Sequence, residues 1–128
     1  PCLAGERFTI PYFPDRDLTY KSTTIKVDDI SLDINISPRP IKAMSNQTLH
    51  IRFSKNKDYI NPTNIVIKMN MKMDMGNFIY KPVVTNGYVN QKFIVPKCIF
   101  FDKRWFIKIE FLYNNKQYST IVFFDVKD

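Results

Sequence analysis

Apolar and polar residues alternate along most of this chain with a period of two. Between Thr23 and Ile36 the apolar residues from Ile30 onward are separated by Ser, Asp and Asn, and the segment from Gln47 to Phe53 repeats the pattern. A period of two places neighbouring side chains on opposite faces of a pleated strand, so each such segment is predicted as a half-buried β-strand. The predicted strands are 23–36, 47–53, 64–75, 78–84, 88–95, 104–113 and 117–126.

Turn residues separate these segments. Two prolines within Ser37–Pro40 end the first strand, Asn86-Gly87 is the strongest short hairpin signal, and Asn114-Asn115 predicts another turn. Residues 1–22 contain several prolines and no sustained period, which indicates an extended N-terminal arm. We therefore expect an all-β fold in residues 23–128: a single immunoglobulin-like sandwich of two antiparallel sheets, with about seven to eight strands.

Composition agrees with one folded domain. The chain has 128 residues, of which 45% are hydrophobic and 15% aromatic, enough apolar surface to form a core. The formal charge of +7 raises the question of an anionic partner. The lysines are scattered singly through the predicted strands rather than clustered in a run, so we expect a solvated basic face and no nucleic-acid binding.

Cys2 and Cys98 are the two cysteines, and neither has a second Cys or a His at the spacing of a zinc site. They could form a disulfide in an oxidising compartment or be two unrelated thiols. We favour the disulfide, because it would tie down the weakly anchored arm. The sequence begins at Pro1 and contains no apolar run of about 20 residues that could span a bilayer, so we expect a soluble domain from which any signal segment has already been removed.

The sequence offers little for catalysis. A single histidine leaves no room for a His-based metal triad, and no nucleophile-elbow, phosphate-loop or HExxH motif is present. His50 is expected to be an outward-facing surface residue rather than a ligand. The chain is therefore predicted not to be an enzyme.

One segment has an unusual composition. Met69, Met71, Met73 and Met75 alternate along the predicted strand 64–75, all on one face. Thioethers are soft ligands that favour Cu(I). Thioethers are also flexible core fillers, which is the alternative interpretation, and Met73 and Met75 are the residues expected to leave the core.

The stretch from Ile65 to Val126 resembles the YtkA-like and FixH-like group of small exported β-sandwich domains. The matching features are the Met-rich strand ending in MDMG (73–76), a Gly-Tyr pair (87–88), VPKC (95–98) and Trp105 at the start of a later strand. Trp105 is expected to be the central core aromatic, near Cys98.

This resemblance implies an immunoglobulin-like domain in the periplasm or at the cell surface, in some relatives membrane-tethered, and in several associated with copper handling or cytochrome oxidase assembly. It implies a Cu(I) site at Met73 and Met75, with Met71 as a weaker third ligand. Relatives that handle copper usually provide a His near the Met cluster, whereas His50 lies in another strand. The alternative is an interaction module that binds a protein of the cell envelope or membrane, with purely structural methionines.

Overall fold

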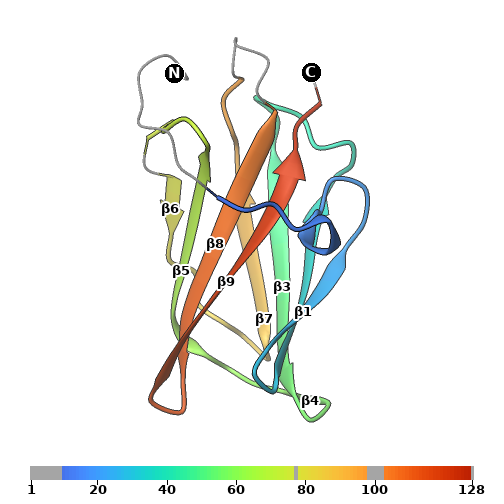
Figure 1. The fold of residues 1–128 in the computed structure, drawn as a ribbon. Coiled ribbons are helices and arrows are strands. Elements are labelled where there is room, and N and C mark those ends of the chain that lie inside the picture. The colour runs from blue at the N-terminus through green and yellow to red at the C-terminus, as the bar shows by residue number, and fades with distance from the viewer. Residues whose placement is uncertain (1–9, 77, 98–102, 128) are drawn as a thin grey trace.

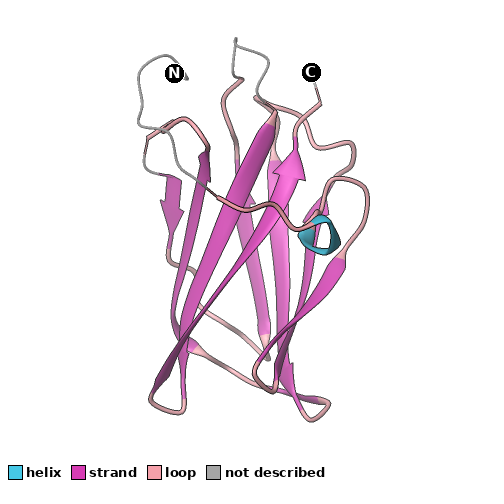
Figure 2. Cartoon of the chain, in the orientation of Figure 1, coloured by secondary structure: helices cyan, strands magenta, loops and turns pink. Residues whose placement is uncertain are grey.

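Nine β-strands and one short 3-10 turn form the regular structure of the computed structural model, which describes residues 10–76, 78–97 and 103–127 (Figures 1 and 2). The turn is η1 (Pro14–Arg16), and the strands are β1 (Thr23–Val27), β2 (Ile30–Ser37), β3 (Gln47–Lys55), β4 (Asp58–Tyr59), β5 (Thr63–Met71), β6 (Phe78–Tyr80), β7 (Tyr88–Phe93), β8 (Arg104–Tyr113) and β9 (Lys116–Asp125).

The strands form two antiparallel sheets that stack face to face (Figure 1). The first sheet has the order β1-β2-β3, and β4 and β7 both pair with the far side of β3; the second has the order β6-β5-β8-β9. The order β2-β3-β7 matches strands A, B and E of the immunoglobulin fold, and β9-β8-β5 matches G, F and C. The predicted immunoglobulin-like sandwich is confirmed.

Nine strands are present in the described residues, whereas about seven to eight were expected. The predicted strand 23–36 is in fact the hairpin β1–β2, which turns at Asp28-Asp29 with Val27 opposite Ile30. A second two-residue turn at Asn56-Lys57 adds the short strand β4. The sequence carries a sign of the first turn, because the apolar residues of β1 occupy odd positions and those of β2 even positions.

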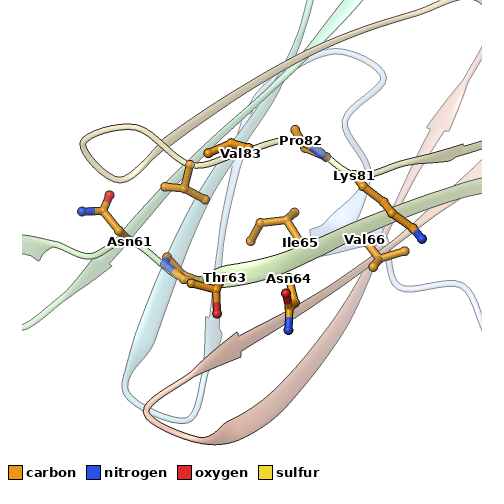
Figure 3. Close-up of a pocket in the computed structure, with 10 residues that line it drawn as sticks. Asn61, Thr63, Asn64, Ile65, Val66, Lys81, Pro82 and Val83 are labelled. Atoms are coloured by element: carbon orange, nitrogen blue, oxygen red, sulfur yellow. The ribbon is translucent and has the colours of Figure 1, made fainter.

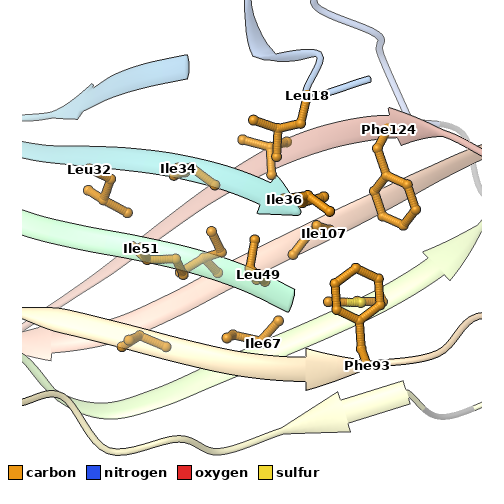
Figure 4. Close-up of a cluster of buried hydrophobic side chains, with 14 of the residues drawn as sticks. Leu18, Leu32, Ile34, Ile36, Leu49, Ile51, Ile67, Phe93, Ile107 and Phe124 are labelled. Carbon is orange, nitrogen blue, oxygen red and sulfur yellow. The ribbon is translucent and has the colours of Figure 1, made fainter. Parts of the chain in front are cut away.

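The core lies between the two sheets (Figure 4). Ile34 and Ile51 from the first sheet face Ile67 and Ile107 from the second, and all four side chains are fully buried. Trp105 is also fully buried, as predicted, and stacks on Phe124 with ring centroids 6.4 Å apart. Alternation along the strands thus places one apolar face of each sheet in a shared interior.

The arm covers the free edge of β9. Leu18 is fully buried, and its backbone N–H donates to the carbonyl of Phe123 at 2.7 Å. The ring of Tyr12 packs edge-on against the ring of Phe123, with centroids 5.2 Å apart. The described part of the arm therefore protects an edge strand that would otherwise expose unpaired backbone groups.

The hairpin expected around Asn86-Gly87 is wrong, although the turn itself is present. Thr85 and Tyr88 form an isolated bridge around it, but β6 pairs with β5 in the second sheet and β7 with β3 in the first. Pro82 contributes no backbone donor between β6 and the turn. The turn instead docks on the first sheet, where the backbone N–H of Phe53 donates to the carbonyl of Gly87 at 2.7 Å.

Cys2 and Cys98, and so the predicted disulfide, lie outside the described residues.

Gly87 provides a test of this docking. Its φ is +74°, and a Cβ added there would lie 2.8 Å from Tyr59 Cβ and 2.9 Å from the carbonyl oxygen of Phe53. The matched control is Gly76, which also has a positive φ but whose added Cβ would meet nothing within 4 Å. We expect Gly76→Ala to lower the free energy of unfolding by about 1–2 kcal/mol, and Gly87→Ala by about 1–3 kcal/mol more. Urea unfolding of both variants measures the difference, and equal losses would contradict the docking of Gly87 against Tyr59 and Phe53.

Candidate functional site

The methionines follow the predicted alternation only as far as the end of β5. Met69 and Met71 face the core and are 1% and 0% exposed. Met75 is 6% exposed and also belongs to the core, whereas Met73 is half-buried. Of the three residues proposed as copper ligands, the structure places Met71 and Met75 inside the hydrophobic core, so the expectation that Met75 leaves the core is wrong.

Asn70 brings Met75 back toward the core. Its side-chain oxygen accepts the backbone N–H of Met71 at 2.9 Å and that of Met75 at 2.8 Å, and its amide donates to Asp74 at 2.9 Å. The amide of Asn70 and the backbone N–H of Gly76 lower the pKa of Asp74 by stabilising its carboxylate. The MDMG segment is therefore an organised loop closed by one asparagine.

The copper site stays a prediction. Within 10–76, 78–97 and 103–127, no group of three or more His, Cys, Asp or Glu side chains could hold a metal ion. A Cu(I) site at the predicted positions would depend on thioethers, and those of Met71 and Met75 are enclosed by apolar side chains. These two methionines would have to leave the core before they could bind an ion.

A different cluster lies on the outer face of the first sheet. The guanidinium carbon of Arg52 lies 4.4 Å from the ring centroid of Tyr59 and 4.8 Å from that of Tyr88. His50 stacks on Tyr88 with ring centroids 6.0 Å apart. We call Ser37, His50, Arg52, Tyr59 and Tyr88 the tyrosine–arginine face.

Strand register explains why these side chains meet. Ile51 and Phe53 point into the core, so the residues between and beside them on β3 point outward. Arg52 is directly opposite Tyr88 on β7. Tyr59 on β4 is opposite Ser54, two residues further along β3, a diagonal distance that long side chains span.

The docked turn holds the two tyrosines in place. The backbone N–H of Gly87 donates to the side-chain oxygen of Asn61 at 2.7 Å, and Gly87 passes directly beside the Cβ of Tyr59. Because Gly87 precedes Tyr88, this one contact fixes the spacing between the strands that carry the two rings. The arrangement of the two rings beside Arg52 is thus a consequence of backbone packing.

His50 connects the face to the end of β2. Its Nδ1 is hydrogen-bonded to the hydroxyl of Tyr88, and its Nε2 lies 2.8 Å from Ser37 Oγ. Burial lowers the pKa of His50, which favours a neutral ring with one donor and one acceptor nitrogen. The predicted surface histidine is thus half-buried, and both ring nitrogens have protein partners.

The Ser37–His50 pair resembles the hydroxyl–imidazole pair of a nucleophilic enzyme. In such enzymes an ionised carboxylate on the second nitrogen stabilises the imidazolium that forms. Here the second nitrogen binds a phenol, and burial opposes the charged ring. The geometry supports a positioning role for His50, and the absence of catalysis stays a prediction.

An apolar groove lies at the start of β5 (Figure 3). It has a volume of about 580 Å³, is lined by residues 61–66 and 81–84, and Figure 3 shows Ile65 between these two segments. The groove exists because β6 pairs with β5 only along Ile67–Met69, so that the chain beyond Tyr80 diverges from the strand. Val83 at its edge is 84% exposed. This space could hold an aliphatic side chain of a bound partner.

No family model, curated protein or solved structure matches this chain. The YtkA-like resemblance therefore stays a prediction. The described residues include no helix with the length and apolar character needed to cross a membrane.

The sequence analysis expected His50 to face outward and assigned it no site, and the alternation of 47–53 places Arg52 on the same face of the strand. The missing information is the pairing of β3 with β7 and β4, which brings in tyrosines from separate segments. A partial signal was present in the sequence, because Tyr88 directly follows the Asn86-Gly87 turn and Tyr59 follows the Asn56-Lys57 turn by two residues.

The lowered pKa of His50 predicts a specific pH dependence. The unfolded chain binds a proton near the ordinary pKa of 6.5, but the folded chain does so only at lower pH. The stability contribution of neutral His50 is therefore complete above about pH 7 and is lost as the pH falls through 6.5 toward the lowered value. The comparison is with His50→Gln, which removes the one histidine of the chain. The difference in urea midpoint, wild type minus variant, should fall between pH 7 and pH 5, and a constant difference would refute the pKa assignment.

Proposed function

We propose that this chain is a non-enzymatic, exported binding module that docks another protein on its tyrosine–arginine face. The observation that carries the proposal is that the guanidinium of Arg52 contacts the rings of both Tyr59 and Tyr88. Tyrosine and arginine are enriched among the residues that dominate binding energy at protein interfaces. Tyr59 is 62% exposed, so the cluster is accessible to a partner.

The side chains of this face are already ordered. An arginine that is free in solution loses about 2 kcal/mol of rotamer entropy when a partner immobilises it. Here the contacts with two rings restrict Arg52 in the folded chain, and His50 fixes the hydroxyl of Tyr88. A partner therefore meets a surface that has lost much of its conformational freedom during folding.

The resemblance to exported sandwich domains suggests the setting. We propose that the partner is an envelope or membrane protein, met in the periplasm or at the cell surface. In this proposal the methionines are structural, a role supported by the burial of Met69, Met71 and Met75.

Copper handling is the second candidate function. One observation favours it: Met73 is half-buried in an organised loop, next in sequence to Asp74, which is half-buried too. A single thioether is a weak site, so Cu(I) binding would need Met71 or Met75 to turn out of the core. Copper binding would therefore require a change in core packing, whereas protein docking on the outer face would not.

Affinity capture tests the docking proposal. We expect the Arg52→Ala/Tyr59→Ala double variant to bind its partner at least about 30-fold more weakly than the wild type, because both anchors are lost. The matched control is Asn90→Ala, an exposed position of β7 on the same outer face. Cross-linking and quantitative mass spectrometry from envelope extracts identify the protein that the wild type and control retain. Equal retention of that protein by the double variant would overturn the proposal.

Two methionine positions separate the two functions. We expect Met71→Ala to lower the free energy of unfolding by about 2–5 kcal/mol and Met71→Leu by less than about 1.5 kcal/mol, because Met71 fills the core. Met73→Leu should leave stability nearly unchanged, which makes it a clean probe of metal binding. Cu(I) titration against a competing chelator should then give the same weak binding for the wild type and Met73→Leu. Tight binding that Met73→Leu abolishes would favour copper handling instead.

A further inference from the structure

Four residues form one row across the outer face of the first sheet. Thr24 is opposite Asp33, Asp33 is opposite Arg52, and Arg52 is opposite Tyr88, so the row spans β1, β2, β3 and β7. The hydroxyl of Thr24 donates to Asp33 Oδ1 at 2.6 Å. Arg52 instead stacks on Tyr88. The two charged residues of the row, Asp33 and Arg52, therefore have different partners.

The lack of an ion pair between Asp33 and Arg52 needs an explanation, because the two residues are directly opposite each other on neighbouring strands. Arg104 and Asp125 are likewise opposite each other in the second sheet, and they close an ion pair with a 2.8 Å contact. Arg52 has no carboxylate oxygen within 4.0 Å of its side-chain nitrogens in the part of the chain that the structure describes. The acid that could neutralise Arg52 is bonded elsewhere.

We infer that Arg52 receives a carboxylate from an acidic segment of the partner protein; this inference rests on the proposed docking function. A guanidinium presents its N–H groups as a planar fork that matches the two oxygens of a carboxylate. The guanidinium contacts the rings of Tyr59 and Tyr88, and in the part of the chain that the structure describes its N–H groups have no carboxylate partner. The two ring contacts and the N–H groups without a carboxylate partner together indicate a carboxylate as the ligand.

Charge around the site favours an acidic ligand. The outer face of the first sheet also carries two exposed lysines, Lys26 on β1 and Lys92 on β7. Asp33 is the acid of the same row, and its Oδ1 already accepts a hydrogen bond. An extended acidic segment that crosses the row at Arg52 would have Lys26 toward one end and Lys92 toward the other, whereas within the row Asp33 lies beside Arg52.

The Thr24–Asp33 bond makes the inference testable with conservative variants. Thr24→Val removes the hydroxyl that holds Asp33, so Asp33 can turn to Arg52 and compete with an incoming carboxylate. Asp33→Asn in the Thr24→Val background removes that competitor. Because Thr24 and Asp33 are exposed, neither change disturbs the core.

The experiment follows the backbone N–H signals of β3 and β7 around the site by ¹H–¹⁵N NMR in every variant, and also the Arg52 Nε–H signal where Arg52 is kept, during titration with a blocked tetraglutamate peptide, with blocked tetraglutamine as the control peptide. We expect a saturable shift with tetraglutamate only. The affinity should fall about tenfold in Arg52→Lys, which keeps the charge but loses the fork, and about threefold in Thr24→Val, with recovery in Thr24→Val/Asp33→Asn.

The contrary outcomes are distinct. Equal affinity in Arg52→Lys, or no loss in Thr24→Val, would show general attraction to a basic surface and would overturn the inference. If tetraglutamate fails to bind while the Arg52→Ala/Tyr59→Ala variant still loses its partner in the capture experiment, the acidic ligand is wrong and the docking function stands. If both fail, the proposed function itself is wrong.

Discussion

Burial of one face of each sheet is the constraint on which the rest of this structure depends. Once Ile51 and Phe53 enter the shared core, His50 and Arg52 must point to the opposite side of the same strand. Antiparallel pairing then places each outward side chain opposite a fixed neighbour on the next strand. The tyrosine–arginine face is therefore determined by the core beneath it, because a shift of register by one residue would bury Arg52.

The alternation along single segments made the fold class predictable. The patterns of 47–53, 104–113 and 117–126 correspond to β3, β8 and β9, and one face of each strand lies in the core. The errors arose where local signals compete with distant packing. Asn86-Gly87 forms its turn, but the docking of Gly87 beside Tyr59 directs the next strand to the other sheet. The position of Met75 depends on the side chain of Asn70, which no periodicity reveals.

Less of the candidate site could be predicted. The sequence shows that Arg52 faces outward, but not which residues lie beside it, because Tyr59 and Tyr88 come from different connections. The methionines attracted attention because four similar residues alternate in a short segment, yet most of them fill space between the sheets. A strongly patterned segment is thus a better guide to the core than to a site, whereas an isolated polar residue acquires its environment only through strand pairing.

The energetics of the Thr24–Asp33–Arg52 row show why a fold could leave such an arginine without an ionic partner. An exposed ion pair stabilises a protein by about 0–1 kcal/mol, and a contact between a cation and an exposed aromatic ring contributes about 0.5–1 kcal/mol. Arg52 has two such rings, and the oxygen of Asp33 keeps a hydrogen bond to Thr24. The folded state therefore loses little by separating the two charges. A carboxylate that reaches Arg52 within a partially desolvated interface gains more than Asp33 would gain in water, because the same charges interact more strongly where the partner excludes solvent. The arrangement costs the isolated domain little and keeps the donors of Arg52 for a complex.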